Sequence, residues 1–275
     1  MQLNTNFSSQ NWNAAWGCTC CPPLPGTRAA FAWQAATKKR AAAARKAAAK
    51  GGAKARRPVA KPSPRRIDVH HHIAPAVYIR AMETLGLAGE NHWQNEVYKG
   101  WSPAVAIETM DEGGTQTAIT TITSGAAIAA HPHKARIARE CNEYAANLKR
   151  DYPGRFGVFA AAPILDIEGS LREAEYALDV LKCDGITLMT NMGDRWLGDP
   201  HYFPLFEELN RRKAVVYTHP ATANCCTNLV PGVSDASIEY GTDTTRAIAR
   251  MIYGGAARKF PNVRMIWSHA GGTMP

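Results

Sequence analysis

The stretch Ile67-Asp68-Val69-His70-His71-His72 is a short, largely apolar segment that ends in three consecutive histidines. We expect it to form a strand, and successive side chains on a strand point to opposite faces of the sheet. His70 and His72 then lie on one face, where both imidazoles can reach the same cation, whereas His71 points away. An isolated His-x-His pair is more often a solvated group at a strand end than a metal site. The remainder of the chain decides between these interpretations.

Downstream of this segment, apolar runs alternate with amphipathic stretches that have helical spacing. Further strands are expected over residues 117–123, 156–162, 185–190, 214–219 and 263–269. Helices are expected over residues 76–85, 103–113, 132–152, 167–181 and 244–260, with a shorter one through residues 206–212 and a loop around Trp196. Near-continuous apolar strands that alternate with helices are typical of a parallel sheet buried on both faces. We therefore expect an α/β domain over residues 67–275, built as a TIM-type (β/α)8 barrel of which about six βα units are present.

Two later strands of this expected barrel also end in histidine, at His219 and His269. The carboxyl ends of the strands of a βα barrel converge on one site, so His70, His72, His219 and His269 would face one cavity although they are far apart in the sequence. Each histidine alone would more often be an ordinary core or surface residue. Their shared placement at strand ends favours a metal site, because imidazole is a common ligand of divalent metals.

Several motifs together resemble one known family. They are Ile67-Asp68-Val69-His70-His71-His72, Trp196-Leu197-Gly198-Asp199-Pro200, Phe206-Glu207-Glu208-Leu209-Asn210-Arg211-Arg212, Val215-Val216-Tyr217-Thr218-His219-Pro220 and Trp267-Ser268-His269-Ala270-Gly271-Gly272. This set, which spans Arg66 to Pro275, resembles the amidohydrolase-2 branch of the amidohydrolase superfamily, which includes aminocarboxymuconate-semialdehyde decarboxylase and the o-hydroxybenzoate decarboxylases. The stretch from Trp196 to Pro220 is most similar to 6-methylsalicylate-decarboxylase-like members.

The resemblance implies a divalent ion, zinc or manganese, held by His70, His72 and His219, with His269 as a catalytic residue beside the water on that ion. It implies a carboxy-lyase that removes carbon dioxide, without oxidation, from a small aromatic or unsaturated carboxylic acid of salicylate type. Two other functions stay open: metal-dependent hydrolysis of an amide, ester or lactone by the same water, and an inactive remnant whose basic tail binds an anionic partner. Related enzymes are commonly dimers, which makes a homodimer the expected assembly.

The expected barrel is incomplete. In the family, the last ligand or acid is an aspartate after the eighth strand, whereas this sequence stops at Pro275, just past the sixth. A complete barrel typically needs about 250 residues. We therefore expect a C-terminally truncated fragment whose first and sixth strands have open edges, and hence poor solubility or obligatory assembly.

The formal charge of +9 is unevenly distributed. Residues 1–66 contain 13 Lys and Arg residues and no acidic residue, so the remainder has a net charge of −4. This first segment, rich in Ala, Lys, Arg and Pro, is expected to be a disordered basic extension, because it has little apolar surface to bury. The domain itself gives no electrostatic argument for specific nucleic-acid binding. No run of about 18 apolar residues occurs, so no membrane span is expected.

The cysteines argue for a reducing compartment. There are seven, an odd number, and they lack the spacing of a disulfide framework. The segment Cys18-Thr19-Cys20-Cys21 lacks the two-residue gap of a zinc knuckle and has no second pair, so no structural zinc site is expected there. The sequence thus predicts a cytoplasmic protein.

Overall fold

The computed structural model of the protein describes residues 66–85, 100–122, 128, 131–193 and 195–274. Every described residue belongs to one compact unit of the chain, Pro58–Pro275. The predicted basic extension, residues 1–66, lies outside the described residues except for Arg66. The segment Cys18 to Cys21 also lies outside them, and the predicted domain boundary at residue 66 is therefore not described. Arg66 donates a hydrogen bond from its side chain to the carbonyl oxygen of Gly113.

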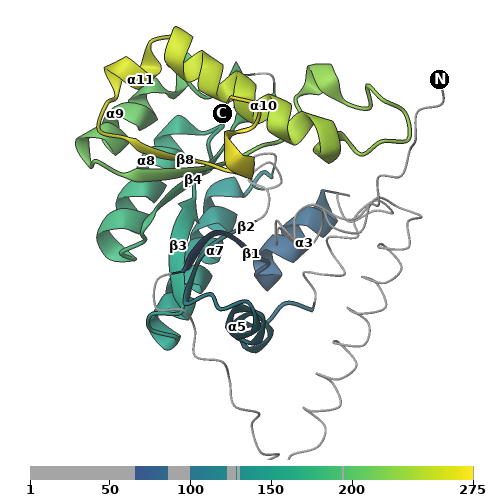
Figure 1. Ribbon diagram of the computed structural model, residues 1–275. Helices are drawn as coiled ribbons and strands as arrows, with labels where there is room; N and C mark the ends of the chain where they lie inside the picture. Colours follow the sequence, from purple (N-terminus) through teal and green to yellow (C-terminus); the bar gives the residue numbers. More distant parts are fainter. Residues whose placement is uncertain (1–65, 86–99, 123–127, 129–130, 194, 275) are drawn as a thin grey trace, which may run out of the picture. The chain divides into compact units, whose positions relative to one another are not determined.

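Six parallel strands form one sheet, in which the order of the strands follows the order of the sequence (Figure 1). They are β1 (Ile67–Ile73), β2 (Thr117–Ile122), β3 (Phe156–Ala161), β4 (Gly185–Met189), β7 (Val215–His219) and β8 (Arg264–Trp267). Every residue of β3 and β4 is buried, as expected for strands that are covered on both faces. The predicted TIM-type arrangement of six βα units is confirmed.

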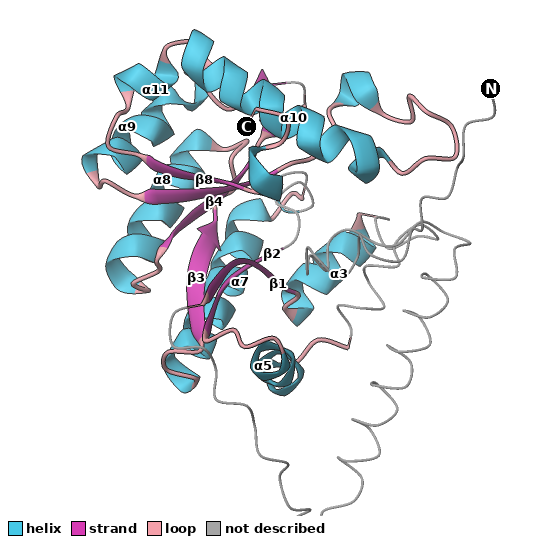
Figure 2. Ribbon diagram, in the orientation of Figure 1, coloured by secondary structure: helices cyan, strands magenta, loops and turns pink. Residues whose placement is uncertain are grey.

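Helices connect these strands and pack around the sheet (Figure 2). They are α3 (Ala76–Thr84), α5 (Pro103–Glu112), α7 (Lys134–Asp151), α8 (Ile167–Glu175), α9 (Phe203–Arg211), α10 (Asp235–Tyr253) and α11 (Ala256–Lys259), with single turns η1 (Tyr176–Val180), η2 (Pro200–Tyr202), η3 (Asn224–Cys226) and η4 (His269–Gly271). Local sequence explains where α5 and α8 begin, since a side chain caps each of them. Ser102, for example, caps α5 by accepting a hydrogen bond from the backbone N–H of Val105, and Pro103 occupies the first helical position.

The core lies between the sheet and the helices. Helix α7 shows the pattern clearly, because Ile137, Cys141, Ala145 and Leu148 recur at helical spacing and are all buried. Burying a side chain such as Leu148 contributes about 2 kcal/mol relative to leaving it in water. None of the described helices combines the length and the apolar character needed to cross a bilayer.

The predicted helix over residues 244–260 is wrong at both ends. Helix α10 begins at Asp235 and ends at Tyr253, and the short helix α11 follows a left-handed turn at Gly255, whose φ is 79°. The early turns of α10 bury polar residues, among them Glu239 and Asp243, so they lack the apolar periodicity that marks Ile248 onward. The prediction therefore placed the start of the helix too late.

Two other segments differ from expectation. The predicted loop around Trp196 contains a small antiparallel hairpin, β5 (Asn191–Met192) with β6 (Arg195–Trp196), whose strands are too short to leave an alternating pattern.

The adjacent residues Cys225 and Cys226 are joined as a disulfide. A bridge between sequence neighbours closes only a small ring through the peptide bond between them, and the cysteine spacing does not predict it.

Candidate metal centre

Strand β1 brings two histidines to the same face. The Nε2 atoms of His70 and His72 lie 2.9 Å apart. His71 points the other way, with its ring 6.3 Å from the ring of Phe156 and its Nδ1 3.6 Å from Oδ2 of Asp68. The alternation of side chains along β1 therefore separates His71 from its two neighbours, as predicted.

A backbone irregularity in β1 includes His70. The pairing of β1 with β2 shifts register between Asp68 and His71, so β1 contains a bulge. The Asp68 carboxylate accepts a hydrogen bond of 2.9 Å from the backbone N–H of His70 within it. Bulges increase the local twist of a strand and re-aim its side chains, and they are common beside active sites. No sequence pattern predicts this bulge.

His219, the last residue of β7, completes a group of three. Its ring centroid lies 5.2 Å from that of His70 and 5.1 Å from that of His72. Its Nδ1 donates a hydrogen bond of 2.8 Å to the carbonyl oxygen of Pro220. The proton thus sits on Nδ1, and Nε2 keeps its lone pair. That Nε2 is buried and has no hydrogen-bond partner among the described residues.

His269 joins this group from the end of β8. Its ring lies 5.0 Å from that of His70 and 5.3 Å from that of His219. His269 has a φ of 50° and Ala270 a φ of 55°, so both occupy the left-handed region that non-glycine residues seldom adopt. The chain turns sharply there, and this turn carries the imidazole to the other three. We call His70, His72, His219 and His269 the histidine cluster.

Burial governs the charge of the cluster. Desolvation, followed by repulsion from His269, lowers the pKa of His70 to about 4, and desolvation lowers the pKa of His269 to about 4. Burial lowers the pKa of His72 and of His219 well below the ordinary value, and each is lowered further by neighbouring imidazoles. The four rings are therefore neutral near pH 7, the form in which imidazole binds a metal.

Three members of the cluster can hold a metal ion. The ligand nitrogens of His70, His72 and His219 lie within 4.8 Å of one another. Two imidazole nitrogens 2.9 Å apart repel each other unless a proton or a cation lies between their lone pairs. Zinc binds histidine nitrogen at about 2.0–2.1 Å, which places two ligands of one ion about 3 Å apart. The donors, their spacing and the His219 Nε2, which has no partner in the described part of the chain, all fit a divalent ion.

Two tyrosines beside the cluster were missed in the sequence. Tyr217, two residues before His219 on β7, lies 5.6 Å from His70 between ring centroids and stacks on Phe159. Alternation along β7 could have indicated it, because residues two apart share a face. Tyr240 on α10 lies 5.7 Å from the rings of both His219 and His269. No pattern pointed to Tyr240, because the start of its helix was predicted wrongly.

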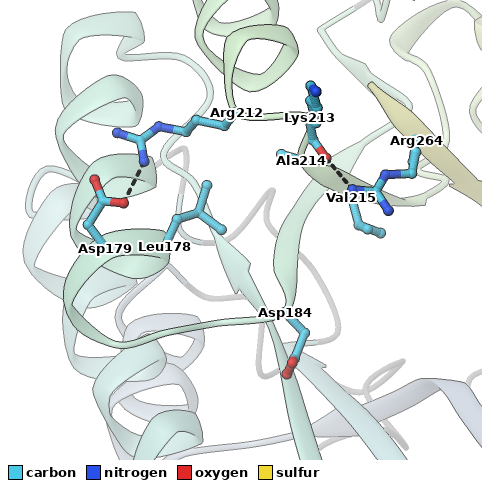
Figure 3. Close-up of a pocket in the computed structure, with 8 residues that line it drawn as sticks. All are labelled: Leu178, Asp179, Asp184, Arg212, Lys213, Ala214, Val215 and Arg264. Atoms are coloured by element: carbon cyan, nitrogen blue, oxygen red, sulfur yellow. Dashed lines mark hydrogen bonds and ion pairs between the residues drawn. The ribbon is translucent and has the colours of Figure 1, made fainter. Parts of the chain in front are cut away.

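A separate pocket of about 350 Å³ lies at the amino ends of the strands (Figure 3). Val215 and Arg264 begin β7 and β8 and line this pocket, which contains no residue of the histidine cluster. Its charged groups have partners nearby, since Arg212 pairs with Asp179 at 2.7 Å, and Arg264 donates a hydrogen bond to the carbonyl oxygen of Lys213. The pocket lies at the opposite edge of the sheet from the cluster, where barrel residues usually serve stability.

Comparisons with known proteins agree with the motif resemblance. The chain is 42% identical over 222 residues to decarboxylase yanB of Aspergillus niger, and this match covers 76% of this chain and 59% of that protein. It is 34% identical over 215 residues to 6-methylsalicylic acid decarboxylase acuB of Aspergillus aculeatus, with 76% of this chain and 64% of that protein covered. The chain thus spans 59% and 64% of the length of these two relatives.

The fold also has a counterpart among solved structures. Dihydroxybenzoic acid decarboxylase from Polaromonas sp. JS666, solved with bound manganese and the inhibitor 2-nitroresorcinol, gives a TM-score of 0.61 at 22% identity, with 76% of this chain and 67% of that chain covered. At this identity the likeness speaks for the fold alone. A family model described as amidohydrolase matches residues 67–275, which include all six strands and the whole histidine cluster. The chain therefore belongs to the amidohydrolase family.

Proposed function

We propose that this domain removes carbon dioxide, without oxidation, from a small aromatic carboxylic acid of salicylate type, in a metal-dependent reaction. The observation that carries the proposal is the buried, neutral histidine cluster, with the unpartnered Nε2 of His219 facing His70 and His72. The similarity to proteins named as decarboxylases supports decarboxylation over hydrolysis.

In this proposal His70, His72 and His219 hold a divalent ion. Zinc suits imidazole ligands, and manganese is the ion bound in the Polaromonas decarboxylase of similar fold. When bound, the ion supplies positive charge that binds the substrate carboxylate and stabilises electron density as carbon dioxide leaves. The bulge at Asp68 and the bond from His219 to Pro220 fix the directions of these ligands before any ion arrives.

His269 is the proposed catalytic residue. The ring carbon that loses carbon dioxide must take up a proton, so a group beside it has to hold and deliver one. His269 is neutral near pH 7, and its Nδ1 lies 3.2 Å from the Ser268 hydroxyl, which orients the ring. It can therefore accept a proton at a ring nitrogen, or polarise a water beside the cluster, and then return the proton toward substrate carbon. Tyr240 lies against both His219 and His269.

Product analysis tests the proposal. The protein is loaded with Mn²⁺ or Zn²⁺ and incubated with 6-methylsalicylate, and 3-methylphenol and carbon dioxide are measured. We expect both products in equal amounts, and no product after His269→Asn, a substitution that the left-handed backbone at this position tolerates. A metal-loaded protein that leaves every salicylate intact but cleaves an ester or lactone would instead establish the hydrolase.

Three narrower predictions belong with this proposal: zinc as the resident ion, a homodimeric assembly and a cytoplasmic location. Metal analysis of protein purified without added metal tests the first, and sedimentation tests the second. Fractionation of cells that produce the untagged protein tests the third.

A further inference from the structure

A fully buried carboxylate lies outside the histidine cluster and has no part in the proposed reaction. Asp243, in the middle of α10, has 0% of its surface exposed. Its Oδ2 accepts hydrogen bonds from the Thr190 hydroxyl and from Nδ2 of Asn191, the latter at 2.8 Å. Its Oδ1 accepts a hydrogen bond of 2.5 Å from Nε1 of Trp196. Burial of a carboxylate is costly unless donors surround it, and here three side chains do so.

All three donors come from one short segment. Thr190 and Asn191 follow the last residue of β4 directly, and Trp196 ends the hairpin of β5 and β6. Asp243 thereby fastens α10 to the carboxyl end of β4. This is the edge of the sheet at which the histidine cluster lies.

The same donors hold the backbone around His219. The backbone N–H of Thr190 donates a hydrogen bond of 2.9 Å to the carbonyl oxygen of His219. Nδ2 of Asn191 donates to Asp243 and also, at 2.8 Å, to the carbonyl oxygen of Ala221. The carbonyl groups of His219 and Ala221, the residues on either side of Pro220, are therefore held by residues whose side chains Asp243 orients.

Helix α10 also contacts the turn that carries His269. Tyr240, about one helical turn before Asp243, lies against the rings of His219 and His269. Farther along the helix, the Thr245 hydroxyl accepts a hydrogen bond of 2.8 Å from the backbone N–H of Thr273, just beyond η4. One helix thus contacts both strand-end histidines, and Asp243 fixes the position of that helix.

We infer that Asp243 is a positioning residue of the histidine cluster, which sets α10 and Tyr240 relative to His219 and His269. This inference rests on the proposed function only in that the cluster binds a metal. It requires no particular substrate.

The test is Mn²⁺ binding by the whole chain with Asp243→Asn, measured by calorimetry without substrate. Asparagine keeps the size of the side chain, but it leaves one oxygen for three donors and turns an NH₂ group toward one of them. We expect the dissociation constant for Mn²⁺ to rise by about 10-fold or more, as for other residues that support metal ligands indirectly. Thr190→Val, which removes one donor, should raise it as well, whereas Thr190→Ser, which keeps the hydroxyl, should bind as the parent protein does.

Glu173→Gln is the matched control. Glu173 is 4% exposed and accepts hydrogen bonds of 2.8 Å from Arg139 and from Asn142, neither of which is a donor to Asp243. The substitution Glu173→Gln should lower the thermal stability of the protein and leave its affinity for Mn²⁺ within about twofold of that of the parent protein. Nitrogen-15 NMR of the histidine rings in metal-free protein gives a second measurement, in which Asp243→Asn, but not Glu173→Gln, should move the signals of His219 and His269.

Two results would overturn the inference: normal Mn²⁺ affinity in both Asp243→Asn and Thr190→Val, or an equal loss in Glu173→Gln. Its failure is distinguishable from failure of the proposed function. A parent protein that binds Mn²⁺ but decarboxylates nothing sinks the function and leaves the inference standing. If the parent protein decarboxylates its substrate and the Asp243→Asn variant binds Mn²⁺ and reacts as the parent does, the proposed function stands and the inference about Asp243 fails.

Discussion

The ring of His70, on the first strand, lies 5.0 Å from the ring of His269, which follows the last strand. Strands β1 and β8 stand at opposite ends of the strand order, so they are far apart when counted across the sheet. The sheet must therefore curl to bring their carboxyl ends together, as in a barrel. This curvature turns histidines from three strand ends into one group.

Replacing His219 by alanine should abolish metal binding. The change removes the buried Nε2 that has no other partner among the described residues, and two imidazoles from β1 then remain. Metal content after dialysis, measured by mass spectrometry, should fall from about one ion per chain to less than about a tenth. His71→Ala is the matched control, because His71 points away from the cluster, and it should retain the ion. Full metal content in His219→Ala would contradict the assignment.

The stability of the metal-free protein should fall on acidification through the range set by the cluster. The pKa values of His70 and His269 are about 4 in the folded protein, below the ordinary 6.5. Between these values the unfolded chain binds more protons than the folded one, so stability is fully present above about pH 6.5 and declines toward pH 4. Urea unfolding should show a loss on the order of 1 kcal/mol per histidine between pH 7 and 5.

The control for this pH effect is a protein with His70→Asn and His269→Asn. It should lose less stability over the same pH range, because two groups that titrate differently in the folded and unfolded states have been removed. Equal slopes for the two proteins would mean that His70 and His269 do not set the pH dependence.

Strands β3 and β4 could be predicted because each is a continuous run of apolar or small residues. Strands β3 and β4 are covered on both faces, so every position is apolar or small and the run stands out in the sequence. The convergence of His219 and His269 with the pair on β1 could be predicted from topology, since His219 ends a parallel strand and His269 lies two residues beyond the end of another. The roles of these residues as ligands and catalyst stay predictions.

The remaining features of the site depend on buried polar contacts, which no periodicity reveals. Asp243 and Glu239 lie inside the fold, whereas a sequence pattern places such residues on a solvated face. Tyr240 was missed with them, because it lies in the same stretch of α10. The bulge before His71 depends on a hydrogen bond from a backbone N–H to the Asp68 carboxylate, and such a bond leaves no trace in composition.

Gly272 should be intolerant of any side chain. It follows the turn of η4 with a φ of 70°, and a Cβ atom there would collide with the carbonyl oxygen of Gly241 on α10. Gly272→Ala should therefore lower the free energy of unfolding by about 1–3 kcal/mol through strain and overlap. It should also weaken Mn²⁺ binding less than it impairs catalysis, because the displaced turn carries His269 and none of the three proposed ligands.

Gly241, the other glycine of this contact, supplies the control variant. A Cβ atom on Gly241 would meet the Cα of Gly272 at 3.9 Å, an ordinary van der Waals distance, and Gly241 lies within a helix. Gly241→Ala should therefore be neutral or raise the free energy of unfolding by up to about 1 kcal/mol, because alanine favours the helix. Chemical denaturation of both variants, with metal affinity and turnover measured in parallel, tests whether the contact between η4 and α10 positions His269. If Gly272→Ala were as stable and as active as Gly241→Ala, the close approach of η4 to α10 would not hold His269 in place.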